Sequence, residues 1–200
     1  MLIAEPYQAT DQVVDQTTIN LPVYFGGYTW VQSGDVSYNT STTETSLLTG
    51  TTVTVDGKPW ANSNKIFQPS SLSVGLRVKV FVAGTITNTG TPSLRTRAGI
   101  VDSAAAFTAL ADTTSTAMTT ITGTGDFEIG VDIFVKALGT SGSVVSRVYH
   151  RYNTTTVYGV ATTTTVDTTK QWTPDVRVTW SASSASNAIV VKYAHVAVDC

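Results

Sequence analysis

Apolar and polar residues alternate one by one through residues 76–82, and this period of two restricts the fold more than any other feature of the sequence. Successive side chains of a β-strand point to opposite faces, so the pattern predicts a strand that covers a core with one face. The apolar face consists of Leu76, Val78, Val80 and Val82, and the other face carries Arg77, Lys79 and Phe81. A chain made of such segments must pair them into sheets, because an isolated strand leaves its backbone groups unpaired.

The same alternation recurs at short intervals. Residues 94–100 place Arg95 and Arg97 on their polar face, and residues 127–135 repeat the pattern. Residues 104–111 are expected to form a loop, with at most a short helical turn. Further strand-like segments lie at residues 144–152, 157–166, 175–180 and 188–198, separated by turn residues. About eight short strands without intervening helices predict an all-β sandwich or barrel rather than a parallel α/β sheet.

The composition agrees with sheets. Threonine is abundant, and its β-branched side chain loses little freedom on a pleated surface. Only 13% of the residues are charged, against roughly 25% in ordinary globular proteins, so solubility depends on hydroxyl groups. The net charge of -2 is too small to attract nucleic acid. No stretch reaches the ~18 apolar residues of a membrane span, and the N-terminus lacks the pattern of a secretion signal.

The first 30 residues differ from the remainder and are expected to form an N-terminal arm or a first strand, in front of one sandwich domain at residues 31–200. Pro6 and Pro22 discourage continuous sheet in this region. Its apolar side chains must be buried either against a neighbouring subunit or against the chain's own domain, and both alternatives stay open. The candidate contacts are Leu21, Val23, Phe25 and Trp30.

The last predicted strand, residues 188–198, is apolar on both faces. Such a strand is either central in a packed sheet or partly covered by another subunit. The only cysteine, Cys200, is the last residue, so no disulfide can form within the chain and we expect no role for this thiol.

No catalytic set is recognisable. The two histidines, His150 and His195, each lie inside a predicted strand, without a motif that links them to a nucleophile. Asp126, Glu128 and Asp132 have the spacing of the polar side of a strand, which we favour over a glycosidase pair or a calcium cluster. We therefore predict no enzyme, no catalytic residue, no bound metal and no cofactor.

Two groups of side chains are candidate binding surfaces. Four basic side chains are expected to share the outer face of two neighbouring strands, namely Arg77, Lys79, Arg95 and Arg97. They form either a positive patch for an acidic partner or a solvated face paired with Glu128 and Asp132 on an adjacent strand. Tyr149, Tyr152 and Tyr158 flank the loop at residues 153–156, where they form either a sugar-stacking surface or ordinary packing contacts.

Three segments carry a resemblance. They are GLRVKVFVAGTITNTGTPSLRTRAGI within residues 74–100, DFEIGVDIFVKALGTSGSVVSRV at residues 126–148 and TTTTVDTTKQWTPDVRVTWSASSASNAIVVKYAHVAV at residues 162–198. Their strands and turns resemble those of tailed-bacteriophage virion proteins. The resemblance implies an antiparallel jelly-roll-like β-sandwich on the phage particle. The shared motifs specify strands and turns rather than reactive groups, so they bear more on the fold than on the function.

The function that the resemblance implies is structural. The expected role is that of a capsid decoration or cement protein that binds across capsid subunits and stabilises the head. The alternative is a fibre or receptor- or carbohydrate-binding module on the head or tail. The implied partners are the major capsid protein and neighbouring copies of the chain as a homotrimer, with a glycan only under the alternative. The implied location is the virion surface, after synthesis in the host bacterial cytoplasm.

Overall fold

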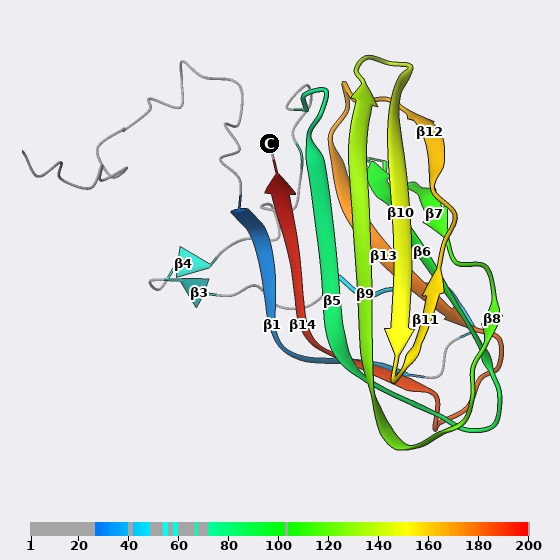
Figure 1. The fold of residues 1–200 in the computed structure, drawn as a ribbon. Coiled ribbons are helices and arrows are strands. Elements are labelled where there is room, and N and C mark those ends of the chain that lie inside the picture. Colours follow the sequence, from blue (N-terminus) through cyan, green and yellow to red (C-terminus); the bar gives the residue numbers. More distant parts are fainter. Residues whose placement is uncertain are drawn as a thin grey trace, which may run out of the picture.

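The computed structural model describes residues 27–39, 42–48, 54–55, 58–59, 67, 72–102 and 104–199. Regular secondary structure in these ranges is all β-strand, and every strand pair is antiparallel (Figure 1). Within the same ranges there is no helix of the length and apolar character that crossing a membrane requires. The all-β, antiparallel prediction is confirmed.

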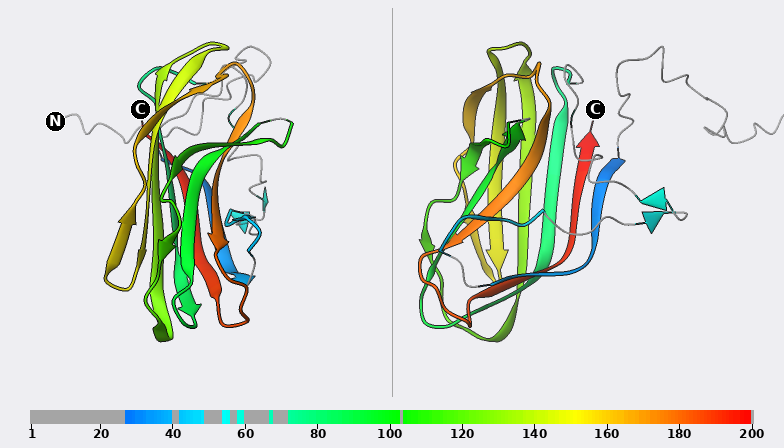
Figure 2. Two further views of the ribbon diagram at one scale, coloured as in Figure 1. Left: turned by 90° about the vertical axis from the view of Figure 1, so that its right-hand side faces the viewer. Right: turned by 180° about the vertical axis from the view of Figure 1, so that it is seen from behind.

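Two sheets pack face to face, with sheet B behind the side of sheet A that carries β9 and β10 (Figures 1 and 2). Sheet A has the order β1 (Gly27–Asn39), β14 (Ala188–Asp199), β5 (Arg77–Asn88), β9 (Ile121–Ala137) and β10 (Gly142–Tyr152), and both β11 (Thr155–Tyr158) and β12 (Thr162–Val166) pair with β10. Sheet B has the order β2 (Thr45–Ser46), β13 (Trp172–Trp180), β6 (Ser93–Asp102) and β7 (Phe107–Asp112), with β8 (Thr116–Ala117) paired to β6. A separate hairpin joins β3 (Thr54–Val55) to β4 (Lys58–Pro59).

The strand order is that of a jelly roll. Strands β1, β14, β5 and β9 form one four-strand layer, and β2, β13, β6 and β7 form the other. The chain passes from one sheet to the other between β1 and β2, between β2 and β5, between β5 and β6, between β8 and β9, between β12 and β13 and between β13 and β14. The hairpin of β9 with β10 then widens sheet A beyond this framework.

The core lies between the sheets. Buried and part-exposed residues alternate along β5, as its sequence period predicts, and Val78, Val80, Val82 and Ile86 point inward. At one end of the core the ring of Trp172 stacks on Phe67, with centroids 4.7 Å apart. β14 lies between β1 and β5, which is the first of the two arrangements considered for the last strand. A bulge between Val191 and Tyr193 shifts the alternation, so that Ile189 and Val191 before it and Val196 and Val198 after it all point to the buried face.

Part of the N-terminal region belongs to the sandwich itself. Strand β1 begins at Gly27 and pairs with β14, so Trp30 lies in a strand of the chain's own sheet, opposite Val196. Leu21, Val23 and Phe25 lie outside the described residues.

The loop expected over residues 104–111 is wrong for most of its length, because Phe107–Asp112 pair with β6 as strand β7. Only the turn before β7 remains a loop. In that turn the Asp102 carboxylate accepts hydrogen bonds from the backbone N–H groups of Ala104 and Ala106, at 2.9 and 3.0 Å.

Candidate functional site

The four basic side chains predicted to form one patch lie on opposite sides of the molecule. Arg77 and Lys79 are on the outer face of sheet A, whereas Arg95 and Arg97 are on the outer face of sheet B. The prediction of a shared face is wrong, because the jelly roll carries the chain from one sheet to the other between β5 and β6.

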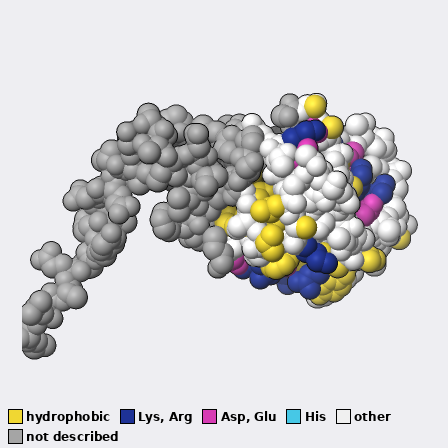
Figure 3. Space-filling model, turned by 90° about the horizontal axis from the view of Figure 1, so that it is seen from above, with side chains coloured by type: hydrophobic (Ala, Val, Ile, Leu, Met, Phe, Trp, Pro, Cys, Tyr) yellow, Lys and Arg dark blue, Asp and Glu magenta, His cyan; other side chains and the backbone are white. Residues whose placement is uncertain are grey.

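Each of these cations is paired within the chain. Arg77 contacts Asp132 at 2.7 Å, and Lys79 pairs with Asp199. Arg95 pairs with Asp112, and Arg97 contacts Glu44 at 2.7 Å. In the view from above, basic side chains accordingly lie beside acidic ones in several places among uncharged polar surface (Figure 3). Of the two earlier alternatives, the paired and solvated face is therefore the better description for Arg77, since its partner is the expected Asp132.

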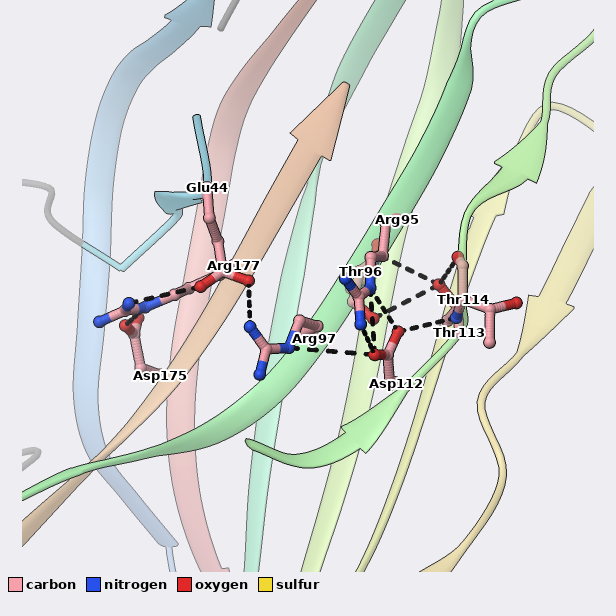
Figure 4. A network of polar contacts seen from close by, with 9 residues as sticks. All are labelled: Glu44, Arg95, Thr96, Arg97, Asp112, Thr113, Thr114, Asp175 and Arg177. Atoms are coloured by element: carbon pink, nitrogen blue, oxygen red, sulfur yellow. Dashed lines mark hydrogen bonds and ion pairs between the residues drawn. The ribbon is translucent and has the colours of Figure 1, made fainter. Parts of the chain in front are cut away.

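The outer face of sheet B carries a network of ion pairs (Figure 4). Glu44 bridges Arg97 and Arg177, at 2.7 and 3.5 Å, and both guanidinium groups lie over the ring of Phe107, at 5.1 and 4.0 Å. Asp175 is 6% exposed and accepts hydrogen bonds from the Oγ of Ser46, at 2.5 Å, and from the Nε of Arg177, at 2.8 Å. The network attaches the short strand β2 to β13.

At the other end of this network, the hydrogen bonds from Arg95 hold the pKa of Asp112 below its ordinary value, although partial burial opposes the shift. Arg97 also lies 3.9 Å from the same carboxylate. The guanidinium and carboxylate groups of this network pair with one another. The network on the outer face of sheet B therefore holds its strands together and does not present a free charge.

The outer face of sheet A carries a row of aromatic residues that crosses the strands. The row is defined by direct cross-strand pairing and runs from β14 to β11 through His195, Phe81, Gly130, Tyr149 and Tyr158. The ring centroids of Phe81 and His195 are 5.6 Å apart, and those of Tyr149 and Tyr158 are 6.0 Å apart. We call these five residues the aromatic row.

Gly130 is the gap in the aromatic row, and it determines where Tyr149 lies. A Cβ atom at position 130 would be 2.2 Å from Cε1 of Tyr149, so the tyrosine ring covers the glycine backbone. Burial, with a smaller contribution from Glu128, raises the pKa of the Tyr149 hydroxyl above its ordinary value. The ring is therefore held against the sheet with its hydroxyl near a carboxylate.

A shallow groove of about 250 Å³ lies over this part of the sheet. Three side chains of the aromatic row line it, namely Phe81, Tyr149 and His195. Two charged side chains beside the row also line it, Lys79 and Asp132. Asp132 is fixed by Arg77 and by Arg147, at 2.7 and 3.2 Å. On the other side of the aromatic row, Arg151 contacts Glu128 at 2.6 Å. Partly exposed ion pairs thus border an aromatic floor on both sides.

The three tyrosines predicted to form one stacking surface do not all lie on the same face of the sheet. Tyr149 and Tyr158 face outward together, and Tyr158 is 68% exposed. Tyr152 is 2% exposed and belongs to the core, so its place in an exposed stacking surface is wrong. Residues 149 and 152 are an odd number of positions apart on one strand and therefore point to opposite faces.

Sequence reasoning missed Phe81, Gly130 and His195 as parts of the same surface. One signal was present, since Phe81 is an aromatic residue on the otherwise charged face of its strand. Gly130 in the middle of a strand was a second signal, because such glycines mark bulges or close approaches. Their juxtaposition depends on strand order and register, which one sequence does not contain.

His150 lies in the core rather than at a surface site. Its Nδ1 is 2.8 Å from Oγ1 of Thr96, and burial lowers the pKa of His150 to about 4. Within the described ranges, no three His, Cys, Asp or Glu side chains are grouped so that they would hold a metal ion. The groove on sheet A is thus the candidate functional site, suited by its geometry to binding. No protein-family model and no curated protein matches this chain.

Proposed function

We propose that this chain is a non-enzymatic structural subunit of a tailed-bacteriophage virion, a decoration or cement protein that binds across capsid subunits. The observation that carries the proposal is where the resembling segments lie in the fold. Residues 75–100 supply β5 and β6, and residues 162–198 supply β12, β13 and β14. β14 pairs with β5 and β13 pairs with β6, so these two of the three resembling segments together make the centre of both sheets.

The charge arrangement is consistent with this role. A subunit present in many copies needs broad contacts without strong attraction to the wrong partner. The outer faces of both sheets carry ion pairs that are satisfied within the chain, such as Arg77 with Asp132 and Arg97 with Glu44. Contacts through such faces are individually modest, and they add up when a protein binds at many equivalent positions.

The test is the copy number and position of the chain on purified virions. Quantitative mass spectrometry is expected to find many copies per particle, and cryo-electron microscopy is expected to place their density on the head. Particles that lack the protein are expected to release their genome at a lower temperature. A few copies confined to the tail would contradict the cement role and favour a fibre. A homotrimer in solution, measured by light scattering, would be consistent with the partner arrangement that we propose.

A further inference from the structure

We propose that the groove on the outer face of sheet A binds a neutral saccharide and stacks one pyranose ring on Tyr149 and Phe81. This binding site goes beyond the structural role and does not depend on it. The observation is the juxtaposition of two aromatic side chains across Gly130 with hydrogen-bonding groups on both sides.

The floor of the groove fits the apolar side of a sugar. A pyranose presents C–H groups on one face and hydroxyl groups around its edge, so it packs flat on an aromatic ring while its edge stays polar. Phe81 and Tyr149 both pair directly with Gly130, from opposite sides. A sugar ring laid on the outer face of Tyr149, which itself covers Gly130, would lie beside Phe81.

The charged side chains that border the groove suit the hydroxyl groups at the edge of a sugar ring. Hydroxyl groups donate to carboxylates and accept from ammonium and guanidinium groups, and Asp132 and Lys79 supply these two kinds of partner in the groove lining. Glu128 and Arg151 supply them on the far side of the aromatic row. Since these groups already pair with charges of opposite sign, the site favours a neutral ligand over an ionic one.

The stacking surface is arranged before a ligand arrives. Tyr149 lies over Gly130, packs against Tyr158 and has its hydroxyl near Glu128, so little side-chain freedom remains to be lost on binding. The volume of about 250 Å³ is below the roughly 300–1,000 Å³ of pockets that enclose drug-sized ligands, and it suits one ring of a longer glycan. Tyr158, exposed at the end of the aromatic row, offers a second stacking position for the next ring.

Saturation-transfer NMR with methyl glucoside, methyl galactoside and N-acetylglucosamine tests the site, together with an array of bacterial polysaccharides. A single ring on an open face is expected to bind with a Kd on the order of 1 mM. Tyr149→Ala and Phe81→Ala are expected to weaken binding at least about tenfold, because each removes one stacking partner. Tyr149→Phe keeps the ring and is expected to retain binding.

Phe134→Ala is the matched control. Phe134 is 43% exposed on the same face of β9 but lies outside the groove lining, so its removal is expected to leave binding unchanged. Absence of signal from every saccharide with folded wild-type protein would overturn the proposal, as would equal weakening by Phe134→Ala. A wild-type oligomer that Tyr149→Ala converts to monomer, without sugar binding, would overturn it too and identify the face as a contact between copies.

Discussion

The Nδ1 atom of His150 on β10 lies 2.8 Å from the Oγ1 atom of Thr96 on β6, so a hydrogen bond inside the core joins the two sheets. Thr96 is in turn linked to Thr113, whose Oγ1 accepts a hydrogen bond from the Thr96 backbone N–H at 3.0 Å. All three side chains are buried. A polar group enclosed in this way is costly to disturb, because water cannot replace a lost partner.

Acid is therefore expected to destabilise the fold through His150. Burial lowers the pKa of His150 from 6.5 to about 4, so the unfolded chain binds a proton more readily than the folded one between these values. The stabilisation is complete above pH 6.5 and is lost as the pH falls toward about 4, for a total of roughly 3 kcal/mol. Urea unfolding at several pH values measures this slope.

The control for this slope must separate His150 from the other histidine. His150→Leu is expected to flatten the pH dependence in this window. His195→Gln is expected to change it less, because His195 is only partly buried, although burial lowers its pKa too. Equal slopes for wild type and His150→Leu would contradict the prediction.

Thr96→Val tests the bond between the sheets. The substitution keeps the shape of the side chain but leaves the Nδ1 of His150 without its hydroxyl partner, which is expected to lower the free energy of unfolding by about 1–3 kcal/mol. Thr179→Val on the outer face of β13 is the matched control, and its effect is expected to stay within about 0.5 kcal/mol. Chemical denaturation of both variants provides the comparison, and similar losses would show that the bond contributes nothing specific.

Gly130→Ala is expected to lower the free energy of unfolding by about 1–3 kcal/mol, because the new methyl group forces Tyr149 out of its position. In a Tyr149→Ala background the same change is expected to cost much less, since the obstructing ring is gone. A double-mutant cycle measures this coupling.

Gly84→Ala is expected to destabilise the fold more than Gly130→Ala does. A Cβ atom at position 84 would lie 2.0 Å from the backbone oxygen of Val190, so the paired strands β5 and β14 themselves would have to separate. Independent, additive effects of Gly130→Ala and Tyr149→Ala, or a smaller effect at position 84 than at 130, would refute the role of these close approaches.

Asp175→Ala is expected to lower the free energy of unfolding by about 1.5–3 kcal/mol, because its buried carboxylate accepts hydrogen bonds from Ser46 and Arg177. Asp35→Ala is the control. Its ion pair with Lys192 is exposed on both sides, and such pairs contribute about 0–1 kcal/mol. Thermal unfolding is expected to show a larger loss of stability for Asp175→Ala than for Asp35→Ala. An equal loss of stability in both variants would argue against a stabilising role for the network on sheet B.

Local patterns in the sequence were sufficient to predict the strands. The period of two in residues 76–82 reflects a strand with one buried face, and β5 has that burial pattern. The same rule contained the correct orientation of Tyr149 and Tyr152, since an odd spacing on a strand separates two side chains. The spacing alone therefore excludes one shared outer surface for these two tyrosines.

The composition and alternation of the chain thus determined its class, an antiparallel all-β fold with a low-charge, threonine-rich surface. The tertiary structure decided which strands lie side by side and so which side chains share a sheet face. It separated Arg77 from Arg95 by placing β5 and β6 in different sheets, and it brought Phe81, Gly130 and Tyr149 into one row. The physical reason is that burial of a strand face is a local property of alternating residues. Strand order and register, in contrast, depend on contacts between segments far apart in the chain.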